Sequence, residues 1–337
     1  MKKIRIAQIG AAHLHAGAAY NAILKNPEHF ELVGLAVPKE EQDEKHPFYK
    51  RYKNDITHSV EEILSLPDLD AVAIEVSEKN LSKYALMAAK RGLHLYLDKP
   101  GGAIPEEFEE LIETVKKNKA VLHMGYMYRY NPAFIELLEK VRRGDIGDVF
   151  SIDAQMSCYC DSYYRAWLGE IPGGMMFNLG CHLIDMVLQI QGEPEEIIPL
   201  NASSGTDGIH TTDLGLAALR YKNGVSTVKT SAVERGGFVR RQFNVFGTKG
   251  TIELRPIERD ATGAHDNSQL CTDIYETYST DWVTVPEHHT TKIYDRYSSM
   301  MLSFASEVRG ENENPYTPDY ELLLYRTLMK CCGVANK

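Results

Sequence analysis

The stretch that decides the fold is IRIAQIGAAHLHAG, residues 4–17. It opens with an alternating strand pattern up to Ile9, continues through a glycine turn, and enters a helical pattern from about His15 to Lys25. A second strand pattern follows from Glu31 to Val37. The order strand, turn, helix, strand predicts the first βαβ unit of a parallel sheet.

The turn at Gly10 predicts a site for the pyrophosphate of a dinucleotide. Such a turn presents backbone N–H groups at a helix N-terminus, where an anion is stabilised. The full fingerprint is G-x-G-x-x-G, and here Ala12 and His15 occupy its second and third glycine positions. We predict cofactor contacts from Gly10, Ala11, Ala12 and His13, with an ordinary tight βα turn as the alternative.

The same alternation continues through the first 125 residues and predicts a doubly wound α/β domain. Ligands of such a sheet bind at the carboxyl ends of its strands. Asp98, Lys99 and Pro100 stand at one such end, so Lys99 is a candidate to contact a reacting hydroxyl, although most lysines are solvated charges. Expected strands are 71–76, 94–97 and 120–124, and expected helices are 59–66, 81–91 and 105–118.

From Gly125 the pattern predicts an α+β domain, a mostly antiparallel sheet with helices on one face. Residues 222–224 and 248–250 have the composition of hairpin turns. Expected strands are 148–159, 196–203, 214–221, 225–234, 241–246 and 250–254; a helix ending near Arg143 and helices at 298–309 and 319–332 are expected, with a loop at 255–269.

The segment GGMMFNLGCHLID, residues 173–185, carries the candidate catalytic residues. A glycine pair opens what we predict to be a helix continuing to about Gln191. Residues three and four apart share a helix face, so Asn178, His182 and Asp185 are expected on one side. A histidine whose tautomer is fixed by an amide and a carboxylate is a proton donor and acceptor. The alternative is a helix-capping cluster with a satisfied histidine.

Length and charge limit the number of domains and the kinds of partner that we expect. A chain of 337 residues predicts two domains, and the change of pattern at Gly125 divides them into a dinucleotide-binding domain at 1–125 and a second domain at 126–337. Whether the C-terminal helices pack back on the first domain is left open. The net charge of -10, without a basic run, argues against nucleic-acid and membrane partners. No signal peptide or apolar run of about 18 residues is present, so we expect a cytoplasmic protein.

The cysteine and histidine spacings indicate no metal site and no disulfide framework. The six cysteines have no paired CxxC spacing. A metal site from His13, His15 and His182 is a further possibility. An H-x-H pair at a helix start does not place both imidazoles on one face, so we expect no metal there.

Five stretches occur in order along the chain: the turn at Gly10 and residues 68–74, 92–100, 129–132 and 173–185. Together they resemble the glucose-fructose oxidoreductase/inositol dehydrogenase/MocA family (Gfo/Idh/MocA) of two-domain dehydrogenases, over essentially the whole chain. In that family a lysine of a Glu-Lys-Pro motif and the histidine of an Asp-x-x-x-His motif face the substrate beside the nicotinamide. Lys99 and His182 match these positions.

The resemblance implies hydride transfer between NAD(P) and a hydroxyl or carbonyl carbon of a sugar, cyclitol or related polyol, in a homodimer or homotetramer. It implies that residues 126–337 are the substrate-binding and oligomerisation domain. It also implies that Asp98, Lys99 and Pro100 contact the cofactor. Asp98 replaces the usual glutamate, and Asn178 replaces the usual aspartate. Because asparagine cannot take a proton, acid/base work falls to His182, with Asn178 orienting the substrate or the imidazole and Asp185 orienting His182.

The choice between NAD and NADP stays open. The strand that should end in an acid for the adenosine ribose ends in Val37-Pro38-Lys39, so the 2′-hydroxyl loses its usual acceptor and Lys39 favours the 2′-phosphate of NADP. Three nearby acids favour NAD instead: Glu40, Glu41 and Asp43.

Candidate substrate contacts lie on the loop expected before the central helix, at residues 163–167, and at Arg129, which precedes the helix that ends near Arg143. Arg129 and the residues Tyr163, Tyr164, Arg165 and Trp167 suit a polyhydroxylated substrate; the alternative is a loop anchored by aromatic packing. An alternative function is a non-catalytic or regulatory ligand-binding protein on a retained dehydrogenase scaffold. It is motivated by the positions that depart from the family pattern together: Ala12, His15, Val37, Asp98 and Asn178.

Overall fold

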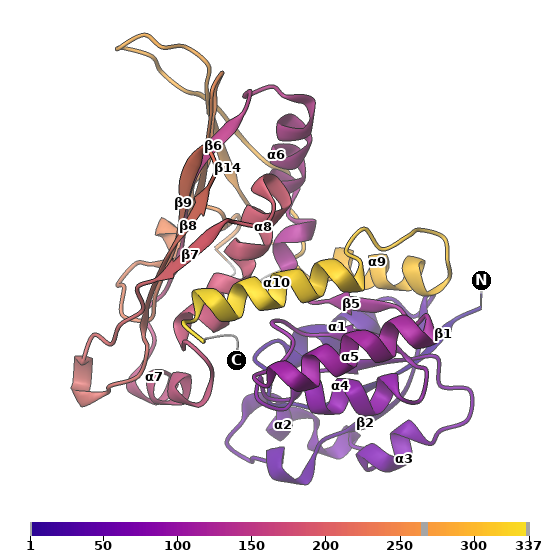
Figure 1. Cartoon of the computed structure of the whole chain (residues 1–337). Helices are drawn as coiled ribbons and strands as arrows, with labels where there is room; N and C mark the ends of the chain where they lie inside the picture. The colour runs from indigo at the N-terminus through magenta and orange to yellow at the C-terminus, as the bar shows by residue number, and fades with distance from the viewer. Residues whose placement is uncertain (1, 264–268, 335–337) are drawn as a thin grey trace. The chain divides into compact units, whose positions relative to one another are not determined.

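The structure is a computed structural model that describes residues 2–263 and 269–334 (Figure 1). The chain divides into two compact units. Unit 1 comprises Met1–Gly125 and Tyr297–Leu322, and unit 2 comprises Tyr126–Arg296 and Leu323–Lys337. Part of the loop expected at 255–269, namely residues 264–268, lies outside the described residues.

Unit 1 is built on a five-stranded parallel sheet of order β2-β1-β3-β4-β5, which confirms the predicted doubly wound sheet. The chain moves from β1 to β2 on one side and then to β3 on the other side of β1. The strand order therefore reverses between β1 and β3, the point where ligands of such sheets bind. The strands are β1 Ile4–Ile9, β2 Phe30–Ala36, β3 Ala71–Ile74, β4 His94–Leu97 and β5 Leu122–Met124.

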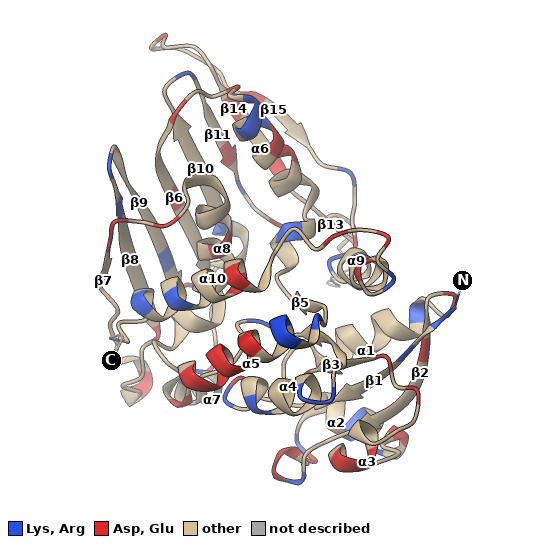
Figure 2. Cartoon of the chain, turned by 45° about the vertical axis from the view of Figure 1, so that its right-hand side comes forward, with Lys and Arg blue, Asp and Glu red and all other residues tan. Residues whose placement is uncertain are grey.

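Local sequence signals set the helix ends of unit 1. α3 begins with a capping box, in which Ser59 and Glu62 satisfy each other's backbone N–H groups. α5 has Pro105 at its first position, glutamates in its first turn and lysines in its last, which complements the helix dipole (Figure 2). α2 was not predicted. The helices are α1 Ala16–Lys25, α2 Pro47–Tyr52, α3 Val60–Leu64, α4 Leu81–Ala89, α5 Pro105–Asn118 and α9 Ser298–Val308.

A buried hydrogen-bonded pair holds α9 to the sheet of unit 1. Nδ1 of His123 on β5 lies 2.9 and 3.1 Å from the two carboxylate oxygens of Glu307 on α9. The Ser303 hydroxyl donates a further hydrogen bond to Glu307, and the Tyr96 ring stacks on the His123 imidazole with centroids 5.6 Å apart. This contact explains how a segment near the C-terminus joins the N-terminal sheet.

Unit 2 contains an eight-stranded sheet of order β15-β14-β11-β10-β6-β9-β8-β7. All neighbouring pairs are antiparallel except β6 and β9, which confirms the predicted mostly antiparallel sheet. The hairpin turns predicted at 222–224 and 248–250 join β8 to β9 and β10 to β11. The strands are β6 Val149–Ser157, β7 Glu196–Pro199, β8 Leu214–Tyr221, β9 Gly224–Ser231, β10 Gln242–Gly247, β11 Thr251–Leu254, β14 Asp273–Thr277 and β15 Glu287–Thr290.

The strands β14 and β15 were not predicted. Within the loop expected at 255–269, β12 Arg259–Asp260 forms a strand, and it pairs with β13 Leu270–Cys271 as a short ribbon. The helices α6 and α8 lie on one face of the large sheet (Figure 1). Among the described residues, every helix is too short or too polar to cross a bilayer. The remaining helices are α6 Pro132–Arg143, α7 Ser162–Trp167, α8 Cys181–Gln191 and α10 Pro318–Cys331.

The segment predicted as one α-helix up to Gln191 contains a π-helical turn, η5, at Met176–Gly180, before α8. The glycine pair that opens it is required sterically, because φ is +60° at Gly173 and +52° at Gly174, and a Cβ on Gly174 would lie 2.1 Å from the carbonyl oxygen of Thr212. The prediction of a continuous α-helix was wrong over η5, since a single π turn with i→i+5 backbone pairing is too short to be recognised from the apolar pattern.

Candidate functional site

The turn after β1 requires glycine at Gly10. Its φ is +108°, and a Cβ there would lie 2.4 Å from the carbonyl carbon of Glu75 and the backbone nitrogen of Val76. The Gly10 N–H donates to the Ala36 carbonyl at 2.8 Å, and the His13 N–H donates to the Glu75 carbonyl at 3.1 Å. The turn containing Gly10, Ala11, Ala12 and His13 is thereby fixed against the carboxyl ends of β2 and β3.

A group of six residues, which we call the strand-end cluster, gathers at the carboxyl ends of β1, β3 and β4. At its centre, Nδ1 of His13 and Nδ1 of His15 each lie 3.1 Å from Oδ2 of Asp98. Nε2 of His13 faces Oε1 of Glu78 at 3.4 Å. The members are His13, His15, Glu75, Glu78, Asp98 and Lys99.

The expectation that His13 and His15 cannot face one point was wrong. It assumed helical spacing, but α1 begins only at Ala16, so both histidines belong to the turn and its junction with the helix. Their rings meet edge to face with centroids 4.8 Å apart. Turn geometry, which the sequence pattern does not reveal, brings both imidazoles to Asp98.

Burial and neighbouring charges together shift the pKa values of the cluster. Burial disfavours a charged Asp98, but the neighbouring imidazoles outweigh it and hold the pKa of Asp98 well below its usual value. Burial likewise opposes protonation of His13, yet Asp98 and Glu78 raise the pKa of His13. For His15 burial dominates and lowers the pKa to about 4. Burial, with Asp98 and Glu78 beside it, raises the pKa of Glu75 well above its ordinary value.

Lys99 is buried directly after β4, with 3% of its surface exposed. Its backbone N–H donates to Oδ1 of Asp98 at 2.7 Å, and its peptide bond to Pro100 is cis. Since Asp98 also contacts the turn after β1, the structure brings together the predicted cofactor residues His13, Asp98 and Lys99 at one edge of the sheet.

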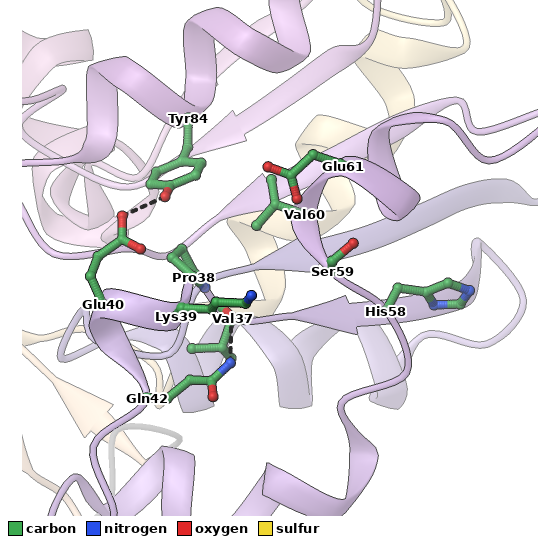
Figure 3. A pocket seen from close by; sticks show the side chains of 10 residues that line it. All are labelled: Val37, Pro38, Lys39, Glu40, Gln42, His58, Ser59, Val60, Glu61 and Tyr84. Atoms are coloured by element: carbon green, nitrogen blue, oxygen red, sulfur yellow. Dashed lines mark hydrogen bonds between the residues drawn. The ribbon is translucent and has the colours of Figure 1, made fainter.

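A pocket of about 410 Å³ lies at the carboxyl end of β2 and is lined by the predicted residues Val37 and Lys39 (Figure 3). On its wall, the Tyr84 hydroxyl donates to Glu40 at 2.6 Å. Glu41 is buried and accepts hydrogen bonds from the Ser77 hydroxyl and the Asn80 amide at 2.6 and 2.8 Å. The acids Glu40 and Glu41 are therefore already engaged within the protein.

In unit 2, His182 lies buried on α8 against two tyrosine rings. The Tyr126 ring is perpendicular to the imidazole with centroids 5.8 Å apart, and the Tyr128 ring is tilted at 5.5 Å. Both tyrosines are themselves buried, which restricts the orientation of the imidazole.

Arg129 and Asp185, predicted as a substrate contact and as the partner of His182, form a buried ion pair with each other. Arg129 lies on the short helix η3, Met127–Tyr130, and its guanidinium covers the Tyr126 ring at 4.6 Å from the centroid. The pairing therefore joins η3 to α8, the helix that carries His182.

The segment predicted as an aromatic loop forms the helix α7. The Asp161 side chain caps this helix, because it accepts a hydrogen bond from the Tyr164 N–H at 2.8 Å. The Asn178 amide donates to the Tyr164 hydroxyl at 2.5 Å, and the Trp167 ring lies 5.1 Å from the Tyr164 ring. Tyr164, Trp167 and Asn178 are thus brought together, whereas Tyr163 is 82% exposed.

Arg165, which lies beside these aromatics in sequence, anchors α7 inside unit 2. It is fully buried, donates to the Thr206 carbonyl at 3.0 Å, and pairs with Asp207 and Asp213. Its guanidinium is therefore engaged by the protein.

The sequence did not predict that Glu75 and Glu78 belong to the site, or that His15 contacts Asp98. One signal was present: Glu75 directly follows the last residue of β3, as Asp98 directly follows the last residue of β4. The carboxyl ends of parallel strands meet at one edge, so two acids in this position are expected to lie close together.

Known proteins match the chain over both units. A family model described as the oxidoreductase family with an NAD-binding Rossmann fold matches residues 4–126, and one described as the GFO/IDH/MocA C-terminal domain matches residues 134–253. The uncharacterized oxidoreductase YrbE of Bacillus subtilis is 25% identical over 274 residues, 78% of this chain and 74% of YrbE.

Myo-inositol 2-dehydrogenase of Thermotoga maritima is 27% identical over 198 residues, which are 57% of this chain and only 58% of that enzyme. The crystal structure of KijD10, a 3-ketoreductase from Actinomadura kijaniata in complex with TDP-benzene and NADP, has the same fold, with a TM-score of 0.77, 15% identity, and coverage of 98% of this chain and 96% of KijD10. From the matches to both of its domain models, the chain belongs to the GFO/IDH/MocA family of oxidoreductases with an NAD(P)-binding Rossmann domain.

Proposed function

We propose that the protein is an NAD(P)-dependent dehydrogenase that transfers hydride between the nicotinamide and a hydroxyl or carbonyl carbon of a sugar, cyclitol or related polyol. The observation that carries the proposal is the buried Lys99 at the carboxyl end of β4, linked through Asp98 to the turn after β1. Membership of the oxidoreductase family supports the reaction type, and the similarity to a myo-inositol dehydrogenase supports the substrate class.

The residues of unit 1 fit a dinucleotide. The turn at Gly10 approaches the end of β3 too closely for any side chain, and it leads into the N-terminus of α1, which suits a pyrophosphate. The pocket at the end of β2 has room for the adenosine end. Lys39 extends along this pocket from the end of the strand (Figure 3).

Each candidate catalytic residue has a chemical role in this reaction. A bound nicotinamide supplies the acceptor or donor of hydride. The ammonium of Lys99 stabilises negative charge that develops on the substrate oxygen. The imidazole of His182 takes the hydroxyl proton during oxidation and returns it during reduction. Asn178 orients substrate or imidazole, because an amide donates hydrogen bonds but accepts no proton.

NADP is our proposed cofactor. Lys39 lines the pocket, and two of the three acids that favoured NAD already accept hydrogen bonds within the protein: Glu40 from Tyr84, and Glu41 from Ser77 and Asn80. The Lys39 ammonium suits a 2′-phosphate.

Two measurements test the proposal. Calorimetric titration of nucleotide-free protein should give heat with NADP, and more weakly with NAD. A screen of sugars, sugar acids and inositols should then reveal a substrate through the near-ultraviolet absorbance of the reduced nicotinamide. Heat from neither cofactor would overturn the dehydrogenase and favour the regulatory ligand-binding alternative.

A matched pair of variants ties the activity to the site. Lys99→Met removes the buried ammonium and should lose activity while cofactor still binds. Lys90→Met makes the same change at an exposed lysine that pairs with Glu110 and should leave turnover unchanged. Equal activity in both variants would remove Lys99 from the mechanism.

A further inference from the structure

The strand-end cluster holds two imidazoles that converge on one carboxylate. Nδ1 of His13 and Nδ1 of His15 are both 3.1 Å from Oδ2 of Asp98, and one ligand atom from each residue lies within 4.8 Å of the others. Around a divalent ion with bonds of about 2.1 Å, adjacent ligand atoms are roughly 3.0–3.4 Å apart. The two imidazole contacts to Asp98 therefore have the spacing of adjacent ligands in one coordination shell.

The hydrogen-bond partners of His13 leave its inner nitrogen as an acceptor. The backbone N–H of His15 donates to Nδ1 of His13 at 3.3 Å, while Nε2 of His13 faces the carboxylate of Glu78 at 3.4 Å. The first contact favours the tautomer with its proton on Nε2, on the side of the Glu78 carboxylate. The lone pair of Nδ1 then faces the Asp98 carboxylate, and a cation bound between the two atoms stabilises this arrangement.

The surroundings of His13 match those of a metal-binding histidine. Such a histidine usually donates its outer N–H to a carboxylate, which fixes the ring and strengthens the ligand, and Glu78 is placed to accept it. Glu75 adds a second feature: its side chain is fully buried, and neither carboxyl oxygen makes a hydrogen bond of ordinary length and angle. One of these oxygens is 3.8 Å from Nδ1 of His13.

We propose that His13, His15 and Asp98 bind a first-row divalent transition-metal ion. Two imidazoles and one carboxylate suit zinc, cobalt or ferrous iron, whereas magnesium and calcium prefer oxygen ligands alone. Glu75 is placed to add a fourth donor or to hold a metal-bound water. The ion links the turn after β1 to the carboxyl ends of β3 and β4, and it places a Lewis acid at the point where the strand order reverses.

A second group in unit 2 serves as a matched control. Glu136, Glu276 and His289 also offer three ligand atoms at metal-site spacing. There a lysine ammonium already contacts both carboxylates, because Nζ of Lys140 lies 2.9 Å from Glu136 and 2.5 Å from Glu276. We therefore expect this group to bind no ion.

Cobalt is the probe. Full-length protein, freed of nucleotide and treated with a chelator, is titrated with Co²⁺ while visible absorption is followed. We expect saturation at one equivalent.

His15→Ala, a change at a partly exposed ligand, should abolish the signal, and Glu78→Gln should weaken binding roughly 10–100-fold. Glu276→Gln should leave the titration unchanged. Because nucleotide and substrate are absent, this result does not depend on the proposed dehydrogenase activity.

Two results would overturn the proposal. One is the absence of a cobalt signal in the wild-type protein, which would mean that the charge between His13 and Asp98 is a proton. The other is a signal that persists in His15→Ala and disappears in Glu276→Gln. If circular dichroism shows that a variant does not fold, X-ray absorption of the wild-type cobalt complex tests the ligands directly. A spectrum without imidazole scattering would contradict the proposed site.

Discussion

Arg129 donates two parallel hydrogen bonds to Asp185 in the interior of unit 2. Nε donates to Oδ2 at 2.9 Å and Nη2 donates to Oδ1 at 3.0 Å, and the two side chains are 1% and 0% exposed. A planar guanidinium can donate two parallel hydrogen bonds to one carboxylate in this forked geometry, whereas a lysine ammonium cannot. The pair therefore fixes α8, and with it His182, to the short helix η3.

Breaking this pair is expected to destabilise unit 2 strongly. Asp185→Ala leaves the Arg129 guanidinium buried without its partner, which should lower the free energy of unfolding by about 3–5 kcal/mol. Arg129→Lys should also be destabilising, because it keeps the charge but loses the fork. Hydrogen exchange of the α8 amides measures the effect within unit 2 alone.

The control for that experiment is the exposed pair of Arg143 and Asp145, whose nearest atoms are 2.7 Å apart. Arg143→Met should leave α8 exchange unchanged, since solvent-exposed ion pairs contribute little. If Asp185→Ala exchanges at the wild-type rate, the pair does not hold the helix.

His182→Asn tests the proposed acid/base residue. An amide keeps a polar group on α8 but neither takes nor returns a proton, so turnover should fall roughly 10²–10⁴-fold. Calorimetry should show nearly normal cofactor binding, because the residue belongs to unit 2 and the dinucleotide-binding residues belong to unit 1. His210→Asn, at an exposed histidine, is the matched control. Full activity in the His182 variant would remove the imidazole from the mechanism.

Much of unit 1 could be predicted because local and long-range signals agree there. α5 and β4 begin and end where the sequence pattern places them. Each buried strand is followed by a turn and an amphipathic helix, and this alternation admits few topologies. The strands β14 and β15 had no such signal. All residues of β15 are exposed, so its pairing rests on backbone hydrogen bonds and leaves no apolar alternation in the sequence.

The residues of the candidate site were likewise predicted only in part. The positions of Lys99 and Asp98 could be predicted, because residues directly after parallel strands meet at one edge of the sheet. The Arg129 to Asp185 pair could not, since its members are 56 residues apart and only the tertiary fold brings them together. The convergence of His15 on Asp98 also depends on the shape of a turn, which residue spacing does not specify.

Lys39→Glu tests the cofactor choice. The change replaces a cation in the pocket at the end of β2 with an acid that repels a phosphate and accepts from a hydroxyl. Loss of one charge-assisted contact is worth about 1.5–3 kcal/mol, so the dissociation constant for NADP should rise roughly 10–100-fold while that for NAD stays the same or falls. Calorimetry with both cofactors gives the two values.

Lys45→Glu makes the same change of charge at an exposed lysine that does not line this pocket. It separates a local effect from the general effect of added negative charge on a protein that already carries a net charge of -10. Equal losses of NADP affinity in the two variants would mean that Lys39 does not contact the 2′-phosphate.

Cys158 is expected to be a reactive thiol at neutral pH. Its Sγ lies 3.3 Å from Sγ of Cys160 near the end of β6. A hydrogen bond from Cys160, opposed by burial and assisted by the Arg241 guanidinium, lowers the pKa of Cys158 from 9.0 to about 7. Because only the thiolate is alkylated, labelling by iodoacetamide should rise with pH and reach half of its maximal rate near pH 7. Mass spectrometry of the peptide that contains residue 158 measures the rate.

The Cys160→Ala variant identifies the cause of that shift. Without the hydrogen bond from the neighbouring thiol, the Cys158 thiolate loses its main stabilisation, so the midpoint of labelling should move to higher pH. Cys332 provides an internal reference, since burial raises the pKa of its thiol well above the ordinary value and it should stay unlabelled throughout. A Cys158 midpoint near 9 in the wild-type protein, unchanged in Cys160→Ala, would show that the two thiols do not interact in this way.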